Sequence, residues 1–458
     1  MYLSEIKQLV GKKVELKGWV FNARSSGSIS FLQFRDGTGY IQIIAEKKNF
    51  SDENWEVIKS ITQESSVKVI GIIREEIRSA YGYEMDLSDF EIYQIAPVDY
   101  PLQPKEHGAD YLLDNRHYWL RTPTQTAIIK VRNEIIYAIY DFFRQEGFIK
   151  IDSPIFTPNA CEGTTTLFEV GYTPAWPEEY VEKMNKSTYD SNKFFDKEGK
   201  KLLSAYLSQS GQLYLEAAIA AHSKVFDFGP TFRAERSKTR RHLTEFWMMD
   251  AEMAFFDHKD NMKTQEKMVK FIIKRCLENC EPELKLLERD TTILKKILEK
   301  DFAIIEHKEA IKMLKEKDDI VVPERDDLGA DEEAALTMHF DTPIFVEKYP
   351  REVKAFYMKE DPNDPTRVLN ADMLAPEGVG EIIGGSQREE LYDKLKKRMD
   401  EEKINIEDYK WYLDLRKYGS VPHSGFGIGL ERTVRWITGR KHIRECIPFP
   451  RMINRITP

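Results

Sequence analysis

Residues 229–246 carry the side chains of this chain that are best suited to chemistry. Arg233 and Glu235 stand two apart in a strand-like run, so both project from one face of that strand. A basic loop follows, and a second apolar run begins at the aromatic Phe246. A hairpin of this kind can bind a polyphosphate and a purine together, although a surface hairpin with solvated charges has the same pattern. The loop residues are Arg236, Lys238, Arg240, Arg241 and His242.

A glycine-spaced run lies near the C-terminus. Gly425, Gly427 and Gly429 alternate with other residues and leave one face of the predicted strand without side chains. A flat ligand or another backbone can approach that face closely. Arg432 lies at the start of the apolar-periodic helix that follows. A glycine-rich turn before a core helix is the alternative, because a glycine pattern alone is a weak signal.

Together, these two segments resemble motifs 2 and 3 of the class II aminoacyl-tRNA synthetases. Residues 148–155, which include Pro154, resemble the dimer-forming motif 1. Residues 208–216 and 380–389 resemble the amino-acid pocket of the aspartate, asparagine and lysine subgroup, and residues 18–39 resemble its anticodon-binding OB domain. The five matches occur in the family's order along nearly the whole chain.

The patterning of the chain predicts two domains. Residues 11–97 contain short runs with strand alternation and one helical insert, which favours a small closed β-barrel of the OB type. We place this domain at residues 1–99. A hinge is expected at residues 100–124, which contain prolines and lack clean periodicity.

Residues 125–458 are predicted to form a class II synthetase catalytic domain of the α+β class. Apolar residues recur at helical spacing from residue 125 to residue 146, so a long amphipathic helix begins this domain. Separated strand patterns follow, which favours an antiparallel sheet with flanking helices over a doubly wound sheet. Charged inserts are expected near residues 174–201 and 259–330, the second being most simply a solvated surface.

The composition is ordinary for a globular protein, with 41% hydrophobic and 32% charged residues among 458. We find no N-terminal targeting signal and no run long enough to span a bilayer, so we expect a cytoplasmic protein without a membrane partner. The net charge of −9 argues against a protein that coats nucleic acid, and we expect no DNA partner. The four cysteines lack metal spacing and are expected to be reduced and mostly buried.

Members of this family join an amino acid to the α-phosphate of ATP, which requires positioning and cationic stabilisation rather than a protein nucleophile. The resemblance implies that Arg233 and Arg432 are the catalytic cations. Arg233 would bridge the α-phosphate and the substrate carboxylate, and Glu235 would accept from the adenine amino group. Phe246 and Arg432 would sandwich the adenine. The implied ATP-binding residues are Arg233, Glu235, Arg241, His242, Phe246, Glu381 and Arg432.

Asp372 and Glu381 are the candidate ligands for Mg²⁺. Magnesium binds carboxylates together with phosphate oxygens and keeps several waters. Two surface acids are the alternative interpretation. Glu381 immediately precedes a buried-strand pattern, Ile-Ile-Gly-Gly, where an unpaired carboxylate would be costly, and this favours the ligand interpretation.

The amino-acid site implied by the resemblance discriminates between asparagine and aspartate. Aspartate enzymes place a lysine three residues after the glutamine of the pocket motif, whereas this chain has Leu215 there. The missing cation leaves a neutral carboxamide acceptable. The Asp250-Ala-Glu252 sequence departs from the Glu-Pro-Glu common in asparagine enzymes and keeps the aspartate alternative open. The implied amino-acid-binding residues are Glu162, Ser210, Gln212, Asp250 and Arg388.

In the predicted barrel, the resemblance implies that Phe31 stacks on the middle anticodon base and that Gln42 and Glu91 read base edges. Stacking on an aromatic platform is a common way to read unpaired bases; without the resemblance, Phe31 would be assigned to the barrel core. The chain is similar to the asparagine enzymes of the subgroup, so ATP, Mg²⁺, L-asparagine and tRNA(Asn) are the expected ligands of a homodimer. An aspartate enzyme, including one of dual specificity, and a catalytically silent paralogue are the alternatives.

Overall fold

The computed structural model describes residues 1–79, 81–103, 105–161, 167–170, 205–234 and 241–458. The insertion expected at residues 174–201 lies outside these residues. The chain divides into two compact units, Met1–Tyr118 and Trp119–Pro458. The division falls within the expected hinge, where two short helices, α3 (Ala109–Asp114) and α4 (Arg116–Trp119), are formed. Helices of this length are too short to show a periodic pattern in sequence.

The first unit contains a closed barrel with strand order β1–β2–β3–β5–β4. Along β3, Ile41, Ile43 and Ala45 are buried, whereas the residues between them are not, because residues two apart share one face of a strand. Helix α2 lies between β3 and β4 in sequence, as predicted, so the barrel is of the OB type. The strands are β1 (Lys13–Ser26), β2 (Ile29–Arg35), β3 (Tyr40–Glu46), β4 (Ser65–Glu75) and β5 (Tyr83–Gln94), with helices α1 (Ile6–Leu9) and α2 (Asp52–Ser60).

The second unit is built around a sheet with strand order β11–β12–β15–β16–β17–β10–β9–β6. The pairs from β12 to β9 are antiparallel, and the edge strands β11 and β6 pair in parallel with their neighbours, so the predicted α+β class is confirmed. The sheet strands are β6 (Ile149–Lys150), β9 (Lys224–Phe232), β10 (Glu245–Ala254), β11 (Ala303–Glu306), β12 (Ile344–Glu347), β15 (Asn370–Ala375), β16 (Gly380–Gln387) and β17 (His423–Gly429). The two small sheets are β7 (Phe156–Thr157) with β8 (Tyr206–Leu207), and β13 (Glu360–Asp361) with β14 (Asp364–Val368).

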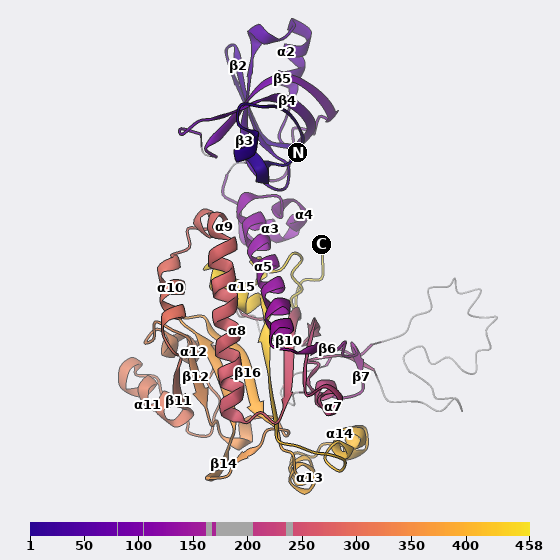
Figure 1. The fold of residues 1–458 in the computed structure, drawn as a ribbon, viewed down its shortest axis with the longest axis vertical. Coiled ribbons are helices and arrows are strands. Elements are labelled where there is room, and N and C mark those ends of the chain that lie inside the picture. The colour runs from indigo at the N-terminus through magenta and orange to yellow at the C-terminus, as the bar shows by residue number, and fades with distance from the viewer. Residues whose placement is uncertain (80, 104, 162–166, 171–204, 235–240) are drawn as a thin grey trace, which may run out of the picture. The chain divides into compact units, whose positions relative to one another are not determined.

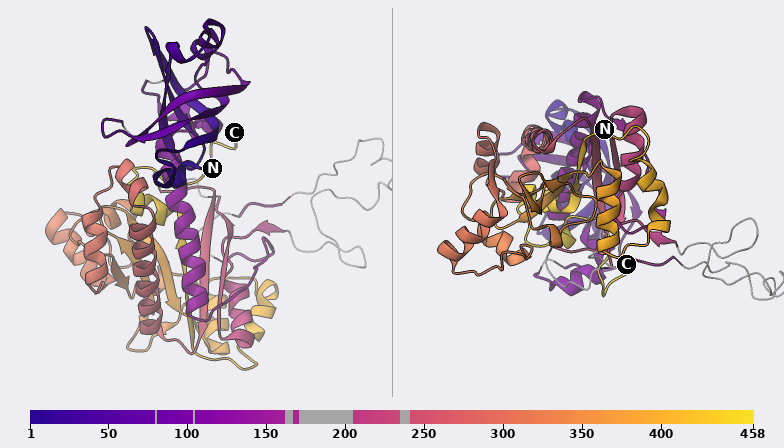
Figure 2. Two further views of the ribbon diagram at one scale, coloured as in Figure 1. Left: turned by 45° about the horizontal axis from the view of Figure 1, so that its top comes forward. Right: turned by 90° about the horizontal axis from the view of Figure 1, so that it is seen from below.

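Helices α5 (Pro123–Gln145) and α8 (His258–Asn279) lie along one face of this sheet (Figures 1 and 2). The apolar residues that α5 shows at helical spacing, including Ile128, Val131 and Phe142, are buried against the sheet, as expected for an amphipathic helix. The other α-helices of the described residues are α7 (Gln212–His222), α9 (Glu281–Leu286), α10 (Thr291–Glu299), α11 (His307–Asp318), α12 (Ala330–Thr337), α13 (Tyr392–Glu401), α14 (Lys410–Asp414) and α15 (Leu430–Thr438).

The expectation of a solvated insert is wrong for α8. Met268, Val269, Ile272 and Ile273 belong to the main apolar core, and α8 packs against α5. The charged residues of the segment occupy the outer side of the helix, so an average over its composition conceals its apolar stripe. Helix α8 is therefore part of the framework that supports the sheet.

The four cysteines are free and buried, as predicted. Burial raises the pKa of the Cys280 thiol to about 12, so this thiol stays protonated and unreactive. Among the residues that the structure describes, none of the helices has the combination of length and apolarity needed to cross a membrane.

Replacing Ile272 by alanine tests the structural role of α8. The side chain is fully buried, so the Ile272→Ala variant should lose about 2–5 kcal/mol of unfolding free energy. The exposed Lys274 on the same helix provides the control, and Lys274→Ala should stay within about 0.5 kcal/mol of the parent protein. Urea unfolding of the two variants measures the difference. Equal stability of the two variants would contradict a role for α8 in the apolar core.

Candidate active site

The sheet face opposite α5 and α8 carries polar residues that come from neighbouring strands. Along β10, Met249, Ala251 and Met253 belong to the apolar core, so Asp250 and Glu252 point to the other face. Both carboxylates are buried. A sheet that is apolar on one side and charged on the other places its chemistry on the charged side.

The alternating glycines of β17 make room for these carboxylates. Gly425 pairs with Glu252, and Gly427 pairs with Asp250. A methyl group at Gly425 would lie 1.9 Å from a carboxylate oxygen of Glu252, and one at Gly427 would lie 2.5 Å from a carboxylate oxygen of Asp250. The sequence therefore predicted the close approach correctly, but the groups that approach these two glycines are side chains of the neighbouring strand.

Asp250 fixes the start of α7. Its carboxylate accepts hydrogen bonds from the Ser210 hydroxyl at 2.8 Å and the Gly211 amide at 2.7 Å. Burial raises the pKa of Asp250 to about 6, against the opposing effect of these donors. Gln212 donates to Glu216 at 3.1 Å from the first turn of the same helix. The structure thus brings together Ser210, Gln212 and Asp250 of the predicted amino-acid site, whereas Glu162 lies outside the described residues.

Arg388 forms a buried two-pronged ion pair with Glu252. Its Nε and one terminal nitrogen each donate to a carboxylate oxygen of Glu252 at 3.0 Å, and the other terminal nitrogen donates to the Ser386 hydroxyl at 2.6 Å. A planar guanidinium held in this way has a defined orientation. Asp250 was predicted to bind the amino acid; in the structure Arg388 pairs with Glu252, two residues further along β10.

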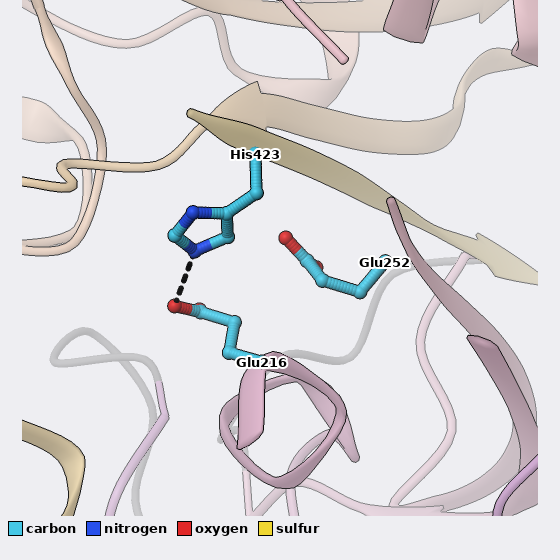
Figure 3. A group of neighbouring side chains, drawn as sticks. All are labelled: Glu216, Glu252 and His423. Atoms are coloured by element: carbon cyan, nitrogen blue, oxygen red, sulfur yellow. Dashed lines mark hydrogen bonds and ion pairs between the residues drawn. The ribbon is translucent and has the colours of Figure 1, made fainter. Parts of the chain in front are cut away.

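Glu216, on α7, is the centre of a second buried cluster. It accepts hydrogen bonds from the Tyr412 hydroxyl at 2.8 and 2.9 Å and from Arg416 at 2.5 Å. His423 Nε2 lies 3.1 Å from the same carboxylate. Figure 3 shows this contact and Glu252 beside it. Ligand atoms of Glu216, Glu252 and His423 lie within 4.8 Å of one another, but arginines already neutralise both carboxylates, so we assign no metal there.

A β-bulge turns Glu381 toward the polar face. The register of β16 shifts beside β15, so that Ile383 faces Met373 while Glu381 faces Leu374. Ile382 and Ile383 both join the apolar core, which strict alternation does not permit. Glu381 consequently lies on the side of Gly384.

Glu381 is held by the predicted catalytic cation Arg432. Arg432 Nη1 donates to the Glu381 carboxylate at 2.7 Å and to its backbone carbonyl at 3.2 Å. Burial opposes ionisation, but the Arg432 guanidinium holds the pKa of Glu381 below its usual range. Arg432 therefore extends from the first turn of α15 over the sheet.

Asp372 lies close to Glu381. A methyl group at Gly384 would lie 3.2 Å from an oxygen of Glu381 and 3.8 Å from an oxygen of Asp372. Lys354 donates to Asp372 at 2.9 Å and to Asp327 at 3.2 Å. Burial and the neighbouring Glu381 raise the pKa of Asp372, and the Lys354 ammonium opposes this rise. The two predicted metal ligands are thus adjacent, and each already contacts a protein cation.

Parts of the predicted ATP site are also adjacent. The Arg233 guanidinium lies 5.4 Å from the centroid of the Phe246 ring, within the range of a cation–π contact. Arg241 is paired with Glu333 and donates to the Ala330 carbonyl at 2.9 Å. Glu333 also accepts from the Glu381 amide at 2.9 Å, which connects Arg241 to the predicted metal ligand. His242 is half-buried beside Arg241, and Glu235 lies outside the described residues.

The barrel places Phe31 and Gln42 on its outer surface. Phe31 is half-exposed on β2, with the Arg24 guanidinium 5.1 Å from its ring centroid, so it is absent from the barrel core. Gln42, opposite Gln33 on the neighbouring strand, donates to Glu84 at 2.6 Å. Glu91 is not part of this group. It pairs with Lys68 at 2.5 Å. The residue of β5 nearest to Phe31 is Asp86, which lies opposite Ile44, the β3 partner of Phe31. Glu91 lies five residues, or about 17 Å, beyond Asp86 along β5.

Sequence reasoning missed several residues that hold the site together. Glu252 could have been found, because it shares its strand face with Asp250 and faces Gly425. Arg416 and Lys354 lie in segments without a chemical pattern, and pairing over such sequence distances comes only from the fold. The residues missed are Glu216, Glu252, Glu333, Lys354, Tyr412, Arg416 and His423.

An OB-type barrel followed by an antiparallel sheet with arginines and carboxylates on one face defines a class II synthetase. Two family models agree: residues 108–453 match the class II tRNA synthetases for D, K and N, and residues 14–93 match the OB-fold nucleic acid binding domain. The chain belongs to the class II tRNA synthetase family of the aspartate, lysine and asparagine type.

Particular relatives are similar over almost the whole chain. The asparagine–tRNA ligase of Streptococcus pneumoniae is 48% identical over 470 residues, covering 99% of this chain and 98% of the relative. The asparaginyl-tRNA synthetase of Pyrococcus horikoshii, solved with asparaginyl-adenylate, is 44% identical with a TM-score of 0.89, covering 100% of this chain and 99% of that one. The enzyme of Entamoeba histolytica, also solved with asparaginyl-adenylate, is 29% identical with a TM-score of 0.83, covering 98% of this chain and 97% of that one.

Proposed function

We propose that this chain is an asparagine–tRNA ligase. The carboxylate of L-asparagine attacks the α-phosphorus of ATP, the bond to the bridging oxygen breaks, and pyrophosphate leaves. A ribose hydroxyl at the end of tRNA(Asn) then attacks the carbonyl of asparaginyl-adenylate, and AMP leaves. The names of the similar proteins support this assignment, and the site supplies the cations that such a reaction requires.

The orientation of Arg388 carries the proposal. Three of its five N–H groups donate to Glu252 and Ser386. Among the described residues, the structure gives no partner to the other two, one on each terminal nitrogen. They can donate to the amide oxygen of asparagine, while the fixed Glu252 carboxylate lies where an amide N–H can donate.

Aspartate fits this arrangement less well. A second carboxylate beside Glu252 would place like charges together in a buried site, which is unfavourable without another cation. Leu215 supplies none, because it is buried in an apolar cluster with Ile219 and Val225. A site built on hydrogen bonds can reject the wrong substrate by about 10⁴-fold.

Pyrophosphate exchange with asparagine and with aspartate tests the proposal. We expect a strong preference for asparagine without tRNA. Equal exchange with both amino acids would favour an aspartate enzyme of dual specificity, and no exchange with either by the folded protein would favour a silent paralogue.

The ATP roles follow the predicted residues. Arg233 would bind the α-phosphate and the substrate carboxylate, while Phe246 and Arg432 would hold the adenine between them and Glu235 would accept from its amino group. Arg241 and His242 would contact the terminal phosphates. The proximity of Arg233 to Phe246 and the position of Arg432 at the start of α15 support these roles.

Asp372 and Glu381 would hold Mg²⁺. Their oxygens lie around the same glycine, and carboxylate oxygens are suitable ligands for a hard cation. The bound ion would neutralise phosphate charge. Lys354 and Arg432 already hold the two carboxylates and would keep them in position for the ion.

The barrel would bind the anticodon. The family model for this unit is a nucleic acid binding domain, and Phe31 presents a half-exposed ring with Gln42 nearby on the same outer surface. Glu91 would contact a different part of the RNA, since it lies farther along β5. A cytoplasmic location suits an enzyme that supplies protein synthesis.

Removing Arg233 should nearly abolish activation. Loss of one charged donor aimed at the reacting phosphate lowers kcat by about 10²- to 10³-fold, so Arg233→Ala should show this loss in pyrophosphate exchange. Arg275→Ala removes an arginine that pairs with Glu134 and Asp141 and serves as the control, with exchange retained. Near-normal exchange by a folded Arg233→Ala protein would contradict the assigned role.

Removing the Phe31 ring should weaken tRNA binding alone. A stacked base contributes about 1–3 kcal/mol, so Phe31→Ala should raise the KM for tRNA and leave tRNA-independent exchange unchanged. Thermal unfolding is the control, because Phe31 is outside the barrel core and the variant should remain folded. An unchanged KM for tRNA would contradict the proposal that Phe31 stacks on an anticodon base.

The segment around Pro154 should form a homodimer contact. Ile155 and Phe156 beside it are exposed apolar side chains, at 44% and 56%. The double variant Ile155→Asp/Phe156→Asp should sediment as a monomer with little activity. Val321 lies outside this segment and is 72% exposed, so the control variant Val321→Asp should sediment with the mass of the parent protein. A fully active monomer in sedimentation would exclude the dimer requirement.

A further inference from the structure

Two carboxylates share one buried space beside the proposed amino-acid site. Oxygens of Glu216 and Glu252 lie within 4.8 Å of each other, and both side chains are almost completely buried. They come from different elements, α7 and β10, and face each other as Figure 3 shows. Like charges this close in a buried site require nearby cations.

Each carboxylate has its own arginine. Glu252 binds Arg388, the residue that faces the substrate in the proposed function. Glu216 binds Arg416, which follows α14 and is itself buried. Arg416 also donates to the Glu389 carbonyl at 3.0 Å, so its guanidinium cannot turn away from Glu216 without losing a second partner.

Arg416 is a cation that the sequence pattern did not reveal. Leu215 carries no charge, but the buried side chain of Arg416 does, and it is paired with Glu216. Burial opposes ionisation of Glu216, but Arg416 and His423 hold its pKa well below the usual range, so the carboxylate is charged. Arg388 also acts electrostatically on Glu216, which links the two pairs.

We propose that Glu216 is a specificity-determining residue, which cancels the charge of Arg416 and thereby denies a substrate carboxylate a second countercharge. The inference rests on the proposed function and explains how the site can contain two arginines and still prefer the neutral amide. Glu216 acts through the electrostatic potential at Arg388 and does not touch the substrate.

His423 is the titratable group that faces Glu216 from β17. Its Nδ1 lies 2.8 Å from the Val421 carbonyl, and its Nε2 faces Glu216, so both ring nitrogens face acceptors. Among the described residues, Tyr412 and Glu252 are the other titratable groups at this carboxylate, and Arg388 and Arg416 are its charged neighbours.

The test compares exchange with aspartate and asparagine in three variants. Glu216→Gln should raise the aspartate-to-asparagine ratio of kcat/KM by roughly 10- to 100-fold, the range for one unit charge several ångströms away at an effective dielectric constant of about 20. Arg416→Gln should lower the ratio, because it leaves Glu216 without its cation. The double variant Glu216→Gln/Arg416→Gln should return the ratio close to that of the parent protein.

The matched control is Glu64→Gln, which breaks the buried pair of Glu64 with Arg35 at 2.7 Å in the barrel and should leave the ratio unchanged.

If Glu216 had a purely structural role, exchange with asparagine and with aspartate would fall together in each variant. The ratio of kcat/KM would then not rise in Glu216→Gln or fall in Arg416→Gln, and that result would overturn the inference. If Glu216→Gln does not fold, the direction of the shift in Arg416→Gln decides the question. A parent protein that does not prefer asparagine would contradict the proposed function, whereas a parent that prefers asparagine with unshifted variants would contradict this inference alone.

Discussion

The division of one sheet into an apolar face and a charged face is the constraint on which the site depends. Alternation along β10 sends Met249 and Ala251 to the helices and Asp250 and Glu252 to the opposite side. Burying that many charges is unfavourable unless each one has a partner. The strands must therefore keep a register in which cations and carboxylates from different strands and helices meet.

The pairing of these charges also prepares the site for its ligands. Arg432 is held by Glu381, Arg241 by Glu333, and Arg388 by Glu252. These three cations are each already oriented by a carboxylate, so little rearrangement is needed when a phosphate or an amide arrives. Substrate oxygens then add to, or replace, partners that already fix the geometry.

The sequence was informative where local pattern and family motif coincide. The barrel, the long helix before the sheet, the glycine strand and the adjacency of Asp372 and Glu381 follow from periodicity and motif position. The link between Arg416 and Glu216 could not be predicted, because the two residues are 200 positions apart and the segment around Arg416 shows no chemical pattern. The apolar stripe of α8 was concealed by its many charged residues, since composition averages over faces that the fold separates.

The bulge at Ile382 has a consequence for how this strand can change over time. Its extra residue interrupts the alternation of side chains between the two faces of the sheet. The residues before the bulge, such as Glu381, and those after it, such as Ser386, therefore do not follow one continuous alternation. Deletion of that one residue would change no other side chain. It would nevertheless turn either the Glu381 carboxylate or the part of the strand that leads to Arg388 toward the helices. A change in the length of this strand would therefore disturb the site more than a substitution, because the spacing from Glu381 to Arg388 decides which face each side chain occupies.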